Sequence, residues 1–461
     1  DAVTTGSDNT AMGVSAFGTN TTGANNTAIG RASLFTNNGN NNTGVGYHSL
    51  RLNTTGANNV GVGYNAGAAN TTGNTNVAVG SFAFDANTTG ISNVAIGQES
   101  MTGSTTSSQN TGCGAYTLYA QTTGADNTGV GYGALFTNTT GNNNVALGSN
   151  ALLNSTTVSN NTAVGKDALK ANTTGASNTA LGTFALFSNT TASDNTAIGK
   201  QALVSNTTGT INTAVGVNSL AANTTGSGNV AVGANALDAN TTANNNTAIG
   251  NVALTQNSTG ANNTALGSGT LSANTTASNN TAIGYEAMDQ NTTGTQNTAV
   301  GVEALDANTT AARNTALGAF ALSSNTTGED NTAVGRSALI TSTTGSNNVA
   351  VGMNSLTAST TASNNTGVGY AALLTNTTGT ANTGVGKDAL KANTTADNNA
   401  ALGTEALLTN TTGASNTGIG SAALYSNTTA SNNTAVGTSA LFANTTGTRN
   451  TAVGSGAVDA N

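Results

Sequence analysis

A seventeen-residue repeat constrains the fold of this chain more than any other feature. The motif Asn-[Thr/Val]-[Ala/Gly]-aliphatic-Gly begins at Asn9 and returns every seventeen residues up to Asn450, apart from one sixteen-residue step between Asn26 and Asn42. The consensus is N-T-A-V-G-x-x-A-L-x-x-N-T-T-G-x-x, with the motif Asn at position 1. Because a disordered low-complexity chain does not keep a fixed phase, this regularity indicates a repeat fold.

The residues accepted at each position predict which side chains face the core. Position 4 is always apolar, position 9 is mostly Leu, and position 2 is mostly Thr, with Val in six repeats. In a strand, positions 2 and 4 point to one face and position 3 to the other. Since a site that accepts either Thr or Val is typical of a half-buried strand, we expect positions 2 and 4 to face the core. The six Val are Val60, Val77, Val94, Val145, Val230 and Val349.

The remaining positions predict the turns. Gly occupies position 5 in all 27 repeats, which suits a backbone bend with positive φ. We expect a second short strand at positions 8 to 10 that brings Leu inward, and a turn at the N-T-T-G of positions 12 to 15. No helical periodicity is present, and seventeen residues are too few for the helical hairpins whose repeats run to about 34 residues.

The predicted fold is therefore an all-β parallel β-solenoid of about 27 coils, forming one continuous repeat domain over residues 1–461. Coils stacked about 4.8 Å apart would make a rod on the order of 130 Å long. The Asn of position 1 would form a column of amides, each bonded to the next, as in cross-β assemblies. The first nine are Asn9, Asn26, Asn42, Asn59, Asn76, Asn93, Asn110, Asn127 and Asn144.

Two positions admit only small residues. Position 3 is Ala or Gly in every repeat, and position 8 is Ala, Ser or Thr. A solvent-facing site would accept charged residues, as positions 6 and 7 do at Lys166, Lys200, Glu286 and Glu303. Positions 3 and 8 are therefore predicted to pack closely against another chain or another wall of the same coil, and we favour another chain.

The motif resembles the head repeat of trimeric autotransporter adhesins. The resemblance rests on N-[TV]-[AV]-[VI]-G followed by x-x-A, as in residues 76–80 and 93–97, and covers essentially the whole chain. In that family such repeats form left-handed parallel β-rolls, with three chains packed together on the bacterial surface. The resemblance therefore implies a left-handed solenoid, a lateral trimer and a surface location. The family's usual coil is shorter than this one, and similar repeats occur in phage fibre-like proteins, which stay an alternative.

Composition excludes several classes of function. The formal net charge is −8, with 10 Lys and Arg against 18 Asp and Glu, which argues against nucleic-acid binding. No run of about 18 apolar residues predicts a membrane span. Cys113 is the single Cys, so no intrachain disulfide or Cys zinc site forms. The sequence begins at Asp1 without Met, which favours an exported, extracellular protein.

The two ends of the sequence fall at nearly the same phase of the repeat. Asn461 stands at position 12, while Thr4, Thr5 and Gly6 supply the rest of such a turn. Neither end carries a polar cap of the kind that solenoids usually need. We expect either a slice of a longer rod or subunits that stack end to end into a filament.

Catalytic, metal and cofactor sites find little support, and we expect a non-enzymatic protein without a cofactor. His48 is the only His and is expected to be exposed at a variable position. Cys113 occupies position 4 and is expected to be a buried apolar thiol. The acidic residues, for example Asp167, Asp388 and Glu405, lack the spacing of calcium-binding β-rolls.

The Asn of position 12 begins an Asn-x-Thr acceptor for glycosylation, and a turn would expose it. The competing interpretation is that Asn merely suits the turn, which the Ser104, Gln121 and Ser155 replacements favour. The candidate glycosylation sites are Asn20, Asn53, Asn70, Asn87, Asn138, Asn172, Asn189, Asn206, Asn223, Asn240 and Asn444.

The function expected from these features is that of a structural subunit of an extracellular fibre or of a surface adhesin shaft or head. Such a rigid spacer would assemble with copies of itself, as a lateral trimer or an end-to-end filament. An ice-binding protein using Thr columns is an alternative. A third class, adhesion to glycans or a host surface, would use the Tyr residues expected to be exposed at position 6, namely Tyr47, Tyr64, Tyr132, Tyr285 and Tyr370.

Overall fold

A computed structural model describes residues 4–459. Asp1 and Asn461, at the two ends whose repeat phase was compared above, lie outside the described residues. The chain divides into two compact units, Asp1–Asn229 and Val230–Asn461. Each unit is a stack of three-residue strands joined by turns, and no helix occurs among the described residues. One continuous domain stays a prediction, as does the hand of the coil.

Unit 1 contains thirteen strands, one at positions 2 to 4 of each coil. They are β1 (Thr10–Met12), β2 (Thr27–Ile29), β3 (Thr43–Val45), β4 (Val60–Val62), β5 (Val77–Val79), β6 (Val94–Ile96), β7 (Thr111–Cys113), β8 (Thr128–Val130), β9 (Val145–Leu147), β10 (Thr162–Val164), β11 (Thr179–Leu181), β12 (Thr196–Ile198) and β13 (Thr213–Val215).

Unit 2 contains fourteen strands at the same positions. They are β14 (Val230–Val232), β15 (Thr247–Ile249), β16 (Thr264–Leu266), β17 (Thr281–Ile283), β18 (Thr298–Val300), β19 (Thr315–Leu317), β20 (Thr332–Val334), β21 (Val349–Val351), β22 (Thr366–Val368), β23 (Thr383–Val385), β24 (Ala400–Leu402), β25 (Thr417–Ile419), β26 (Thr434–Val436) and β27 (Thr451–Val453).

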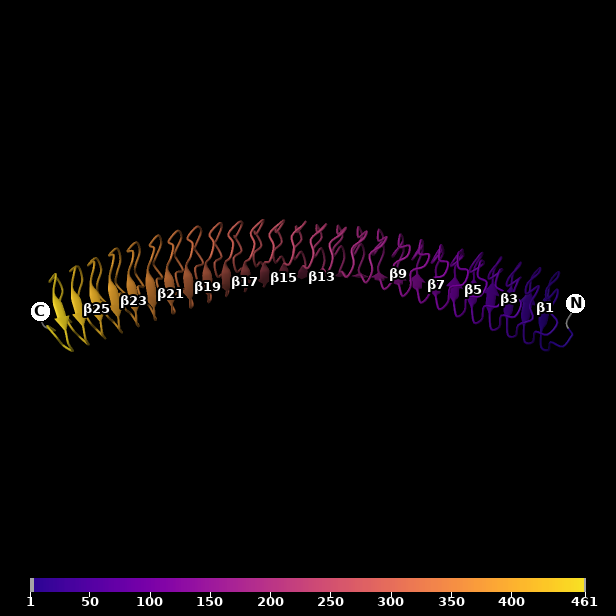
Figure 1. Cartoon of the computed structure of the whole chain (residues 1–461), viewed down its shortest axis with the longest axis horizontal. Coiled ribbons are helices and arrows are strands. Elements are labelled where there is room, and N and C mark those ends of the chain that lie inside the picture. The colour runs from indigo at the N-terminus through magenta and orange to yellow at the C-terminus, as the bar shows by residue number, and fades with distance from the viewer. Residues whose placement is uncertain (1–3, 460–461) are drawn as a thin grey trace. The chain divides into compact units, whose positions relative to one another are not determined.

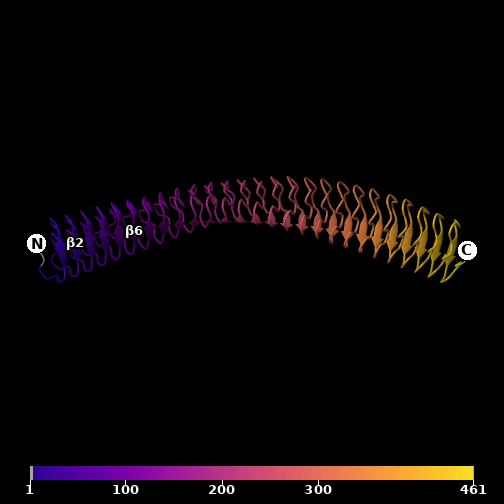
Figure 2. The same cartoon turned by 180° about the vertical axis from the view of Figure 1, so that it is seen from behind.

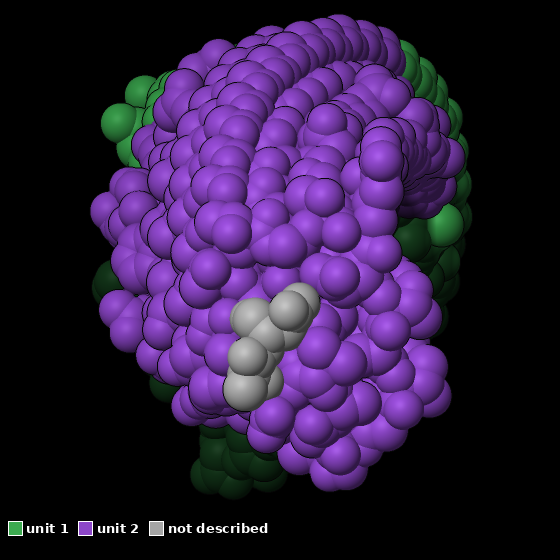
Figure 3. All heavy atoms as spheres, turned by 90° about the vertical axis from the view of Figure 1, so that its left-hand side faces the viewer, with its two compact units in different colours: residues 1–229 green, residues 230–461 purple. Residues whose placement is uncertain are grey.

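Within each unit every strand pairs in parallel with the next strand along the chain (Figure 1; seen from behind in Figure 2). The register joins equivalent positions, as in Thr10 with Thr27 and Ala11 with Ala28. The shortened repeat keeps this register, since Thr27 pairs with Thr43. Because equivalent residues stack, the surface of unit 2 shows continuous parallel ridges of atoms (Figure 3). The predicted parallel β-solenoid is confirmed in both units.

The strand faces are the reverse of those predicted. Position 3 points inward, and Ala28 in β2 is fully buried, whereas Met12 in β1 is 64% exposed and Leu181 in β11 is 45% exposed. The physical reason is a narrow interior. A Cβ built on Gly44 at position 3 would lie 2.5 Å from Ser33 Oγ and 3.1 Å from Leu34 Cγ of the preceding coil, so the interior has no room for a large side chain at this position.

The small residues of positions 3 and 8 therefore pack against another wall of their own solenoid. Our preference for another chain at these positions was wrong. Together with the buried Leu of position 9, they make a thin apolar core that continues from coil to coil. Positions 2 and 4 remain on the outside.

The predicted second strand at positions 8 to 10 is instead part of a turn. Leu34 at position 9 has a φ of 47°, and Leu203 a φ of 51°, in the left-handed region that Leu rarely adopts. This conformation reverses the chain while it aims the Leu side chain inward. Bonding between coils continues through the turn, since the Leu34 N–H donates to the Ser49 carbonyl at 3.0 Å.

The Gly of position 5 is required twice over. Gly199 has a φ of 133°, a conformation that residues with a Cβ avoid. A Cβ at Gly199 would also clash with the carbonyl oxygen of Gly216 in the next coil. The close approach of successive backbones therefore excludes every other residue at this corner.

Candidate functional site

The Asn of position 1 lie in a column along each unit that is buried except at Asn9 and Asn450, which are half-buried. The Asn9 Oδ1 accepts the backbone N–H of Asn26 at 2.9 Å, and the Asn9 Nδ2 donates to the Gly23 carbonyl at 2.8 Å. Each amide thus joins its coil to the next and also connects the two sides of its own coil. Of the two donors to Asn9 Oδ1, the Asn26 backbone N–H is the nearer, while the predicted bond between successive amides is present and longer, at 3.2 Å from Asn26 Nδ2 to Asn9 Oδ1.

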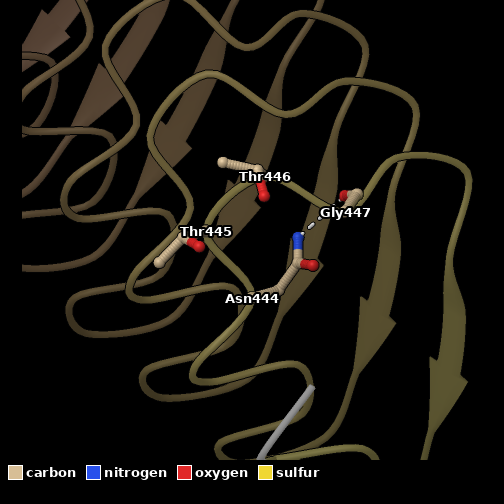
Figure 4. Close-up of a pocket in the computed structure, with 4 residues that line it drawn as sticks. All are labelled: Asn444, Thr445, Thr446 and Gly447. Atoms are coloured by element: carbon tan, nitrogen blue, oxygen red, sulfur yellow. Dashed lines mark hydrogen bonds between the residues drawn. The ribbon is translucent and has the colours of Figure 1, made fainter.

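A second Asn column, at position 12, is also buried, so the expectation that the turn exposes these residues was wrong. Figure 4 shows the turn at Asn444, whose Nδ2 points toward the carbonyl of Gly447 and donates to it at 3.0 Å. The Asn70 Nδ2 likewise donates to the Asn53 Oδ1 at 2.7 Å. A glycan on Nδ2 would replace one of its two donor hydrogens, and the buried side chain leaves no space for a sugar inside the coil. The buried sites are Asn20, Asn53, Asn70, Asn87, Asn138, Asn172, Asn189, Asn206, Asn223, Asn240 and Asn444.

Both Thr of the N-T-T-G turn lie outside this column. At position 13 the hydroxyl is engaged, as in the Thr54 Oγ1, which donates to the Thr71 carbonyl at 2.9 Å. At position 14 the side chain is exposed, as at Thr55 and Thr72. Position 13 therefore reinforces the contact between coils, and position 14 faces solvent.

Positions 2 and 4 form an outward-facing outer stripe along each unit. Position 4 is apolar in every coil, and its exposed members include Ile96, Leu147, Leu181, Leu266 and Leu317. Soluble monomers rarely expose a long contiguous apolar patch. The sequence carried the signal for this stripe in the unvarying small residue at position 3, which marks the inner face.

The corrected faces also change the environment of Cys113. Because position 4 points outward, Cys113 at the end of β7 is exposed rather than buried. No group of three or more His, Cys, Asp or Glu that could hold a metal ion occurs within residues 4–459.

His48 is half-buried rather than freely exposed. Its ring stacks on Tyr47, with ring centroids 3.8 Å apart. Burial, followed by the positive charges of Arg51 and Arg31, lowers the pKa of the imidazole. Ser15, Arg31, Ala32, Phe35, His48 and Arg51 line one surface hollow, which we call the basic hollow.

The five Tyr of position 6 are all exposed, as expected. Two of them continue a row of rings from the basic hollow. Tyr47 and Tyr64 stack at 5.2 Å, and Tyr64 meets Phe82 edge-on at 5.1 Å. The Arg31 guanidinium lies 5.8 Å from the centre of the Tyr47 ring. The sequence analysis considered these Tyr without the arginines. The register of the coils places Arg31, from position 6, and Arg51, from position 10, beside them.

Acidic residues gather at one place in unit 2. Asp306 lies near Asp289 in the preceding coil, with Glu303 and Glu286 beside them. Burial, then the charges of Asp289, Glu303 and Glu286, raises the pKa of Asp306 to about 6. Of the acidic residues named from the sequence, Asp167 pairs with Lys170 at 3.0 Å and Asp388 with Lys391 at 3.0 Å. Glu405 lies 3.9 Å from Lys387.

Comparison with known proteins gives no family assignment. No protein-family model matches the chain, and no curated protein shows significant sequence similarity to it. Among the described residues, no helix is long and apolar enough to cross a membrane.

Proposed function

We propose that this chain is a structural subunit of an extracellular fibre or a surface adhesin, in which it acts as a rigid, self-assembling spacer. The observation that carries the proposal is the in-register stack with two buried Asn columns on one side and an uninterrupted apolar outer stripe on the other. The proposal includes no catalytic activity.

Rigidity follows from the bonding between coils. Almost every backbone position of a coil contributes, and the Asn columns add buried side-chain bonds. Hydrogen bonds in a buried environment are costly to leave unmade, so one coil cannot rotate against the next without losing several of them. Such a stack resists bending and offers a protease few accessible loops.

Self-assembly is supported by the outer stripe. Position 2 accepts Thr or Val, as at Thr43 and Val60 in adjacent coils, so the shared branched shape matters more than the hydroxyl. A stable interface buries about 800 Å² on each partner, and the outer stripe offers an exposed or half-buried apolar side chain for contact in every coil of a unit. Because the stripe repeats with every coil, a second copy with the same repeat is the partner that matches it throughout. A lateral trimer, as in the adhesin heads that the motif resembles, is one assembly of this kind.

Ice binding is the second candidate, since position 2 places Thr on a flat strand face. Three successive coils carry Val60, Val77 and Val94 there, which interrupts the hydroxyl column. The turn hydroxyls of position 13 are engaged with backbone carbonyls, as at Thr54. These features favour a protein–protein interface over a face that orders water for ice binding.

Sedimentation velocity tests the proposal with the fold kept intact. We expect the wild-type chain to sediment as a multiple of its 44.6 kDa mass. Four exposed stripe residues are replaced in one variant, which should sediment as a monomer because Lys cannot be buried unpaired. The replacements are Leu147→Lys, Leu181→Lys, Leu266→Lys and Leu317→Lys.

A control variant carries the same added charge at position 16, where Glu329 shows that charge is tolerated. It should assemble like the wild type, and its replacements are Ala57→Lys, Ala125→Lys, Ala176→Lys and Ala261→Lys. A monomeric wild-type chain at all concentrations, or a stripe variant that assembles unchanged, would contradict the proposal.

A further inference from the structure

We infer that the basic hollow and the adjoining row of aromatic rings bind an acidic polysaccharide, with Arg31 and Arg51 holding a sulfate or carboxylate group. This site is independent of the outer stripe. A spacer without it would still assemble, so it adds a ligand to the proposed function and does not rest on it.

Positive charge gathers at the basic hollow without an acidic partner. The chain has a net charge of −8, yet two arginines and its only His line one hollow. Among the other described basic residues, Lys170, Arg313, Lys387 and Lys391 form ion pairs with acidic residues, and those without an ion pair, Lys166, Lys200, Arg336 and Arg449, lie in four different repeats. Within residues 4–459, neither arginine of the hollow has an acidic side chain in ion-pair range. Like charges placed together without a counter-charge are unfavourable, and an oxyanion in the hollow would remove this cost.

The stacking of two coils brings the three basic side chains to one place. Arg31 occupies position 6 of one coil, and His48 and Arg51 occupy positions 7 and 10 of the next, so parallel stacking places them around one depression. The His48 backbone N–H donates to the Arg31 carbonyl at 3.0 Å, which fixes the relation between the two coils at this point. Guanidinium groups bind sulfate and carboxylate oxygens through paired N–H donors.

A row of aromatic rings lies beside the basic hollow. Tyr47, Tyr64 and Phe82 extend away from the hollow over three successive coils, and all three rings are exposed. Because Tyr47 stacks on both His48 and Tyr64, these rings present their edges and phenolic hydroxyls to solvent, and the hydroxyls can hydrogen-bond the hydroxyl groups of a sugar. A row of rings beside one anion site matches a chain of sugars with periodic acidic groups better than a free inorganic anion.

His48 supplies a specific reporter, since it is the only His in the chain. The ionisable groups that face it are Arg51, Arg31 and the adjacent Tyr47. An anion between the arginines would offset their charges and raise the midpoint of the imidazole titration. One proton NMR resonance of the imidazole therefore reports on occupancy without interference.

The experiment follows the His48 resonance of the full chain during addition of dextran sulfate, polygalacturonate, neutral dextran or inorganic sulfate. We expect a saturable shift with at least one acidic polymer, weakened at high salt, and no shift with neutral dextran. Inorganic sulfate should require at least about 100-fold higher concentration, because it gains nothing from the rings.

Variants separate the parts of the site. Arg31→Gln with Arg51→Gln should weaken polymer binding at least about tenfold. Tyr64→Ala should weaken the polymer but leave inorganic sulfate unchanged. Arg336→Gln is the matched control, because Arg336 occupies position 6 of another coil and does not line the hollow, and it should bind like the wild type.

Four results would overturn the inference: no His48 shift with either acidic polymer, an equal shift with neutral dextran, unchanged binding by the double arginine variant, or an equal loss with Arg336→Gln. If inorganic sulfate binds as tightly as the polymers, the site is an anion site without a polysaccharide, and the inference fails in that form. The sedimentation of these variants is expected to match the wild type, so failure here is distinct from failure of self-assembly.

Discussion

The backbone N–H of Asn178 donates to the side-chain Oδ1 of Asn161 at 2.9 Å, across one full coil. The same Asn161 amide donates from Nδ2 to the Gly175 carbonyl at 3.0 Å, and Asn172 of the second column donates to that carbonyl at 2.9 Å. The two Asn columns therefore converge on one backbone oxygen in this coil, as they do where Asn53 and Asn42 both donate to the Gly56 carbonyl. This convergence explains why Asn occurs at position 1 in every repeat, since no other side chain of this length both accepts and donates in the required directions.

Replacing Asn161 with Ala should destabilise its coil. The Gly175 carbonyl keeps its bond from Asn172, but the buried Asn178 N–H loses its acceptor, at a cost of about 1–3 kcal/mol. Native-state hydrogen exchange of the Asn178 amide measures the effect locally, which suits a repeat array that need not unfold in one step. Asn251→Ala, at an exposed position 6, serves as the control and should change little. Equal protection of Asn178 in the wild type and in Asn161→Ala would contradict this role.

A pair of Leu substitutions tests the assignment of the two faces. Leu203→Ala removes a fully buried position 9 side chain and should cost about 2–5 kcal/mol. Leu181→Ala removes an exposed position 4 side chain and should change stability by about 0.5 kcal/mol or less in the dissociated chain. Thermal unfolding followed by circular dichroism compares them in a background that keeps Leu181 and carries Leu147→Lys, Leu266→Lys and Leu317→Lys to prevent assembly. The reverse order of effects would restore the face assignment first expected from the sequence.

The corner glycine should not tolerate a Cβ. Gly199→Ala drives a methyl group into the Gly216 carbonyl oxygen at a φ of 133°, so we expect a loss of about 3 kcal/mol or more. Gly456→Ala is the comparison, because a Cβ added there would meet no heavy atom within 4 Å and its φ is 65°. That change should cost about 1 kcal/mol. Similar melting temperatures for the two variants would show that neighbouring coils are spaced more widely at this corner than the structure shows.

Acid should stabilise unit 2 through Asp306. The folded pKa is raised to about 6, chiefly by burial and then by the charges of Asp289, Glu303 and Glu286. The unfolded carboxyl ionises near its ordinary value of about 3.9, so the folded chain binds the proton more tightly. Stability therefore falls as the pH rises from about 4 to 6, by about 1 kcal/mol or less once solvent screening of this partly exposed group is counted.

Asp306→Asn should reduce the dependence of stability on pH between about pH 4 and 6. Melting temperatures of the wild type and the variant between pH 4 and pH 7 give the comparison, with Asp397→Asn, away from this acidic cluster, as the control. Parallel profiles for the wild type and Asp306→Asn would rule out the raised pKa.

The repeat period predicted the solenoid and its register, because only a stacked coil keeps equivalent residues aligned. The faces were predicted in reverse because apolar character at position 4 was taken as the sign of burial. The sharper signal was the restriction of position 3 to Ala and Gly, as at Ala28 and Gly44, since size is limited most strictly in a narrow interior. The left-handed Leu34 could not be foreseen, because local preference disfavours that conformation and tertiary packing imposes it.

The candidate sites likewise depend on contacts between coils that the sequence does not display. The basic hollow depends on the stacking of Arg31 over the coil that carries His48 and Arg51, and separate positions in a sequence do not display that neighbourhood. The Asn of position 12 were predicted to be exposed because they match a glycosylation motif. Their replacement by small polar residues, such as Ser104 and Ser155, already indicated a confined polar site. Both Ser are buried in the structure.

X-ray diffraction from oriented films of the purified chain tests the central claim most directly, which is that successive repeats stack as parallel strands in register. We predict a strong reflection near 4.8 Å along the axis of orientation, corresponding to the distance between neighbouring strands. An oriented film without that axial reflection would contradict the account.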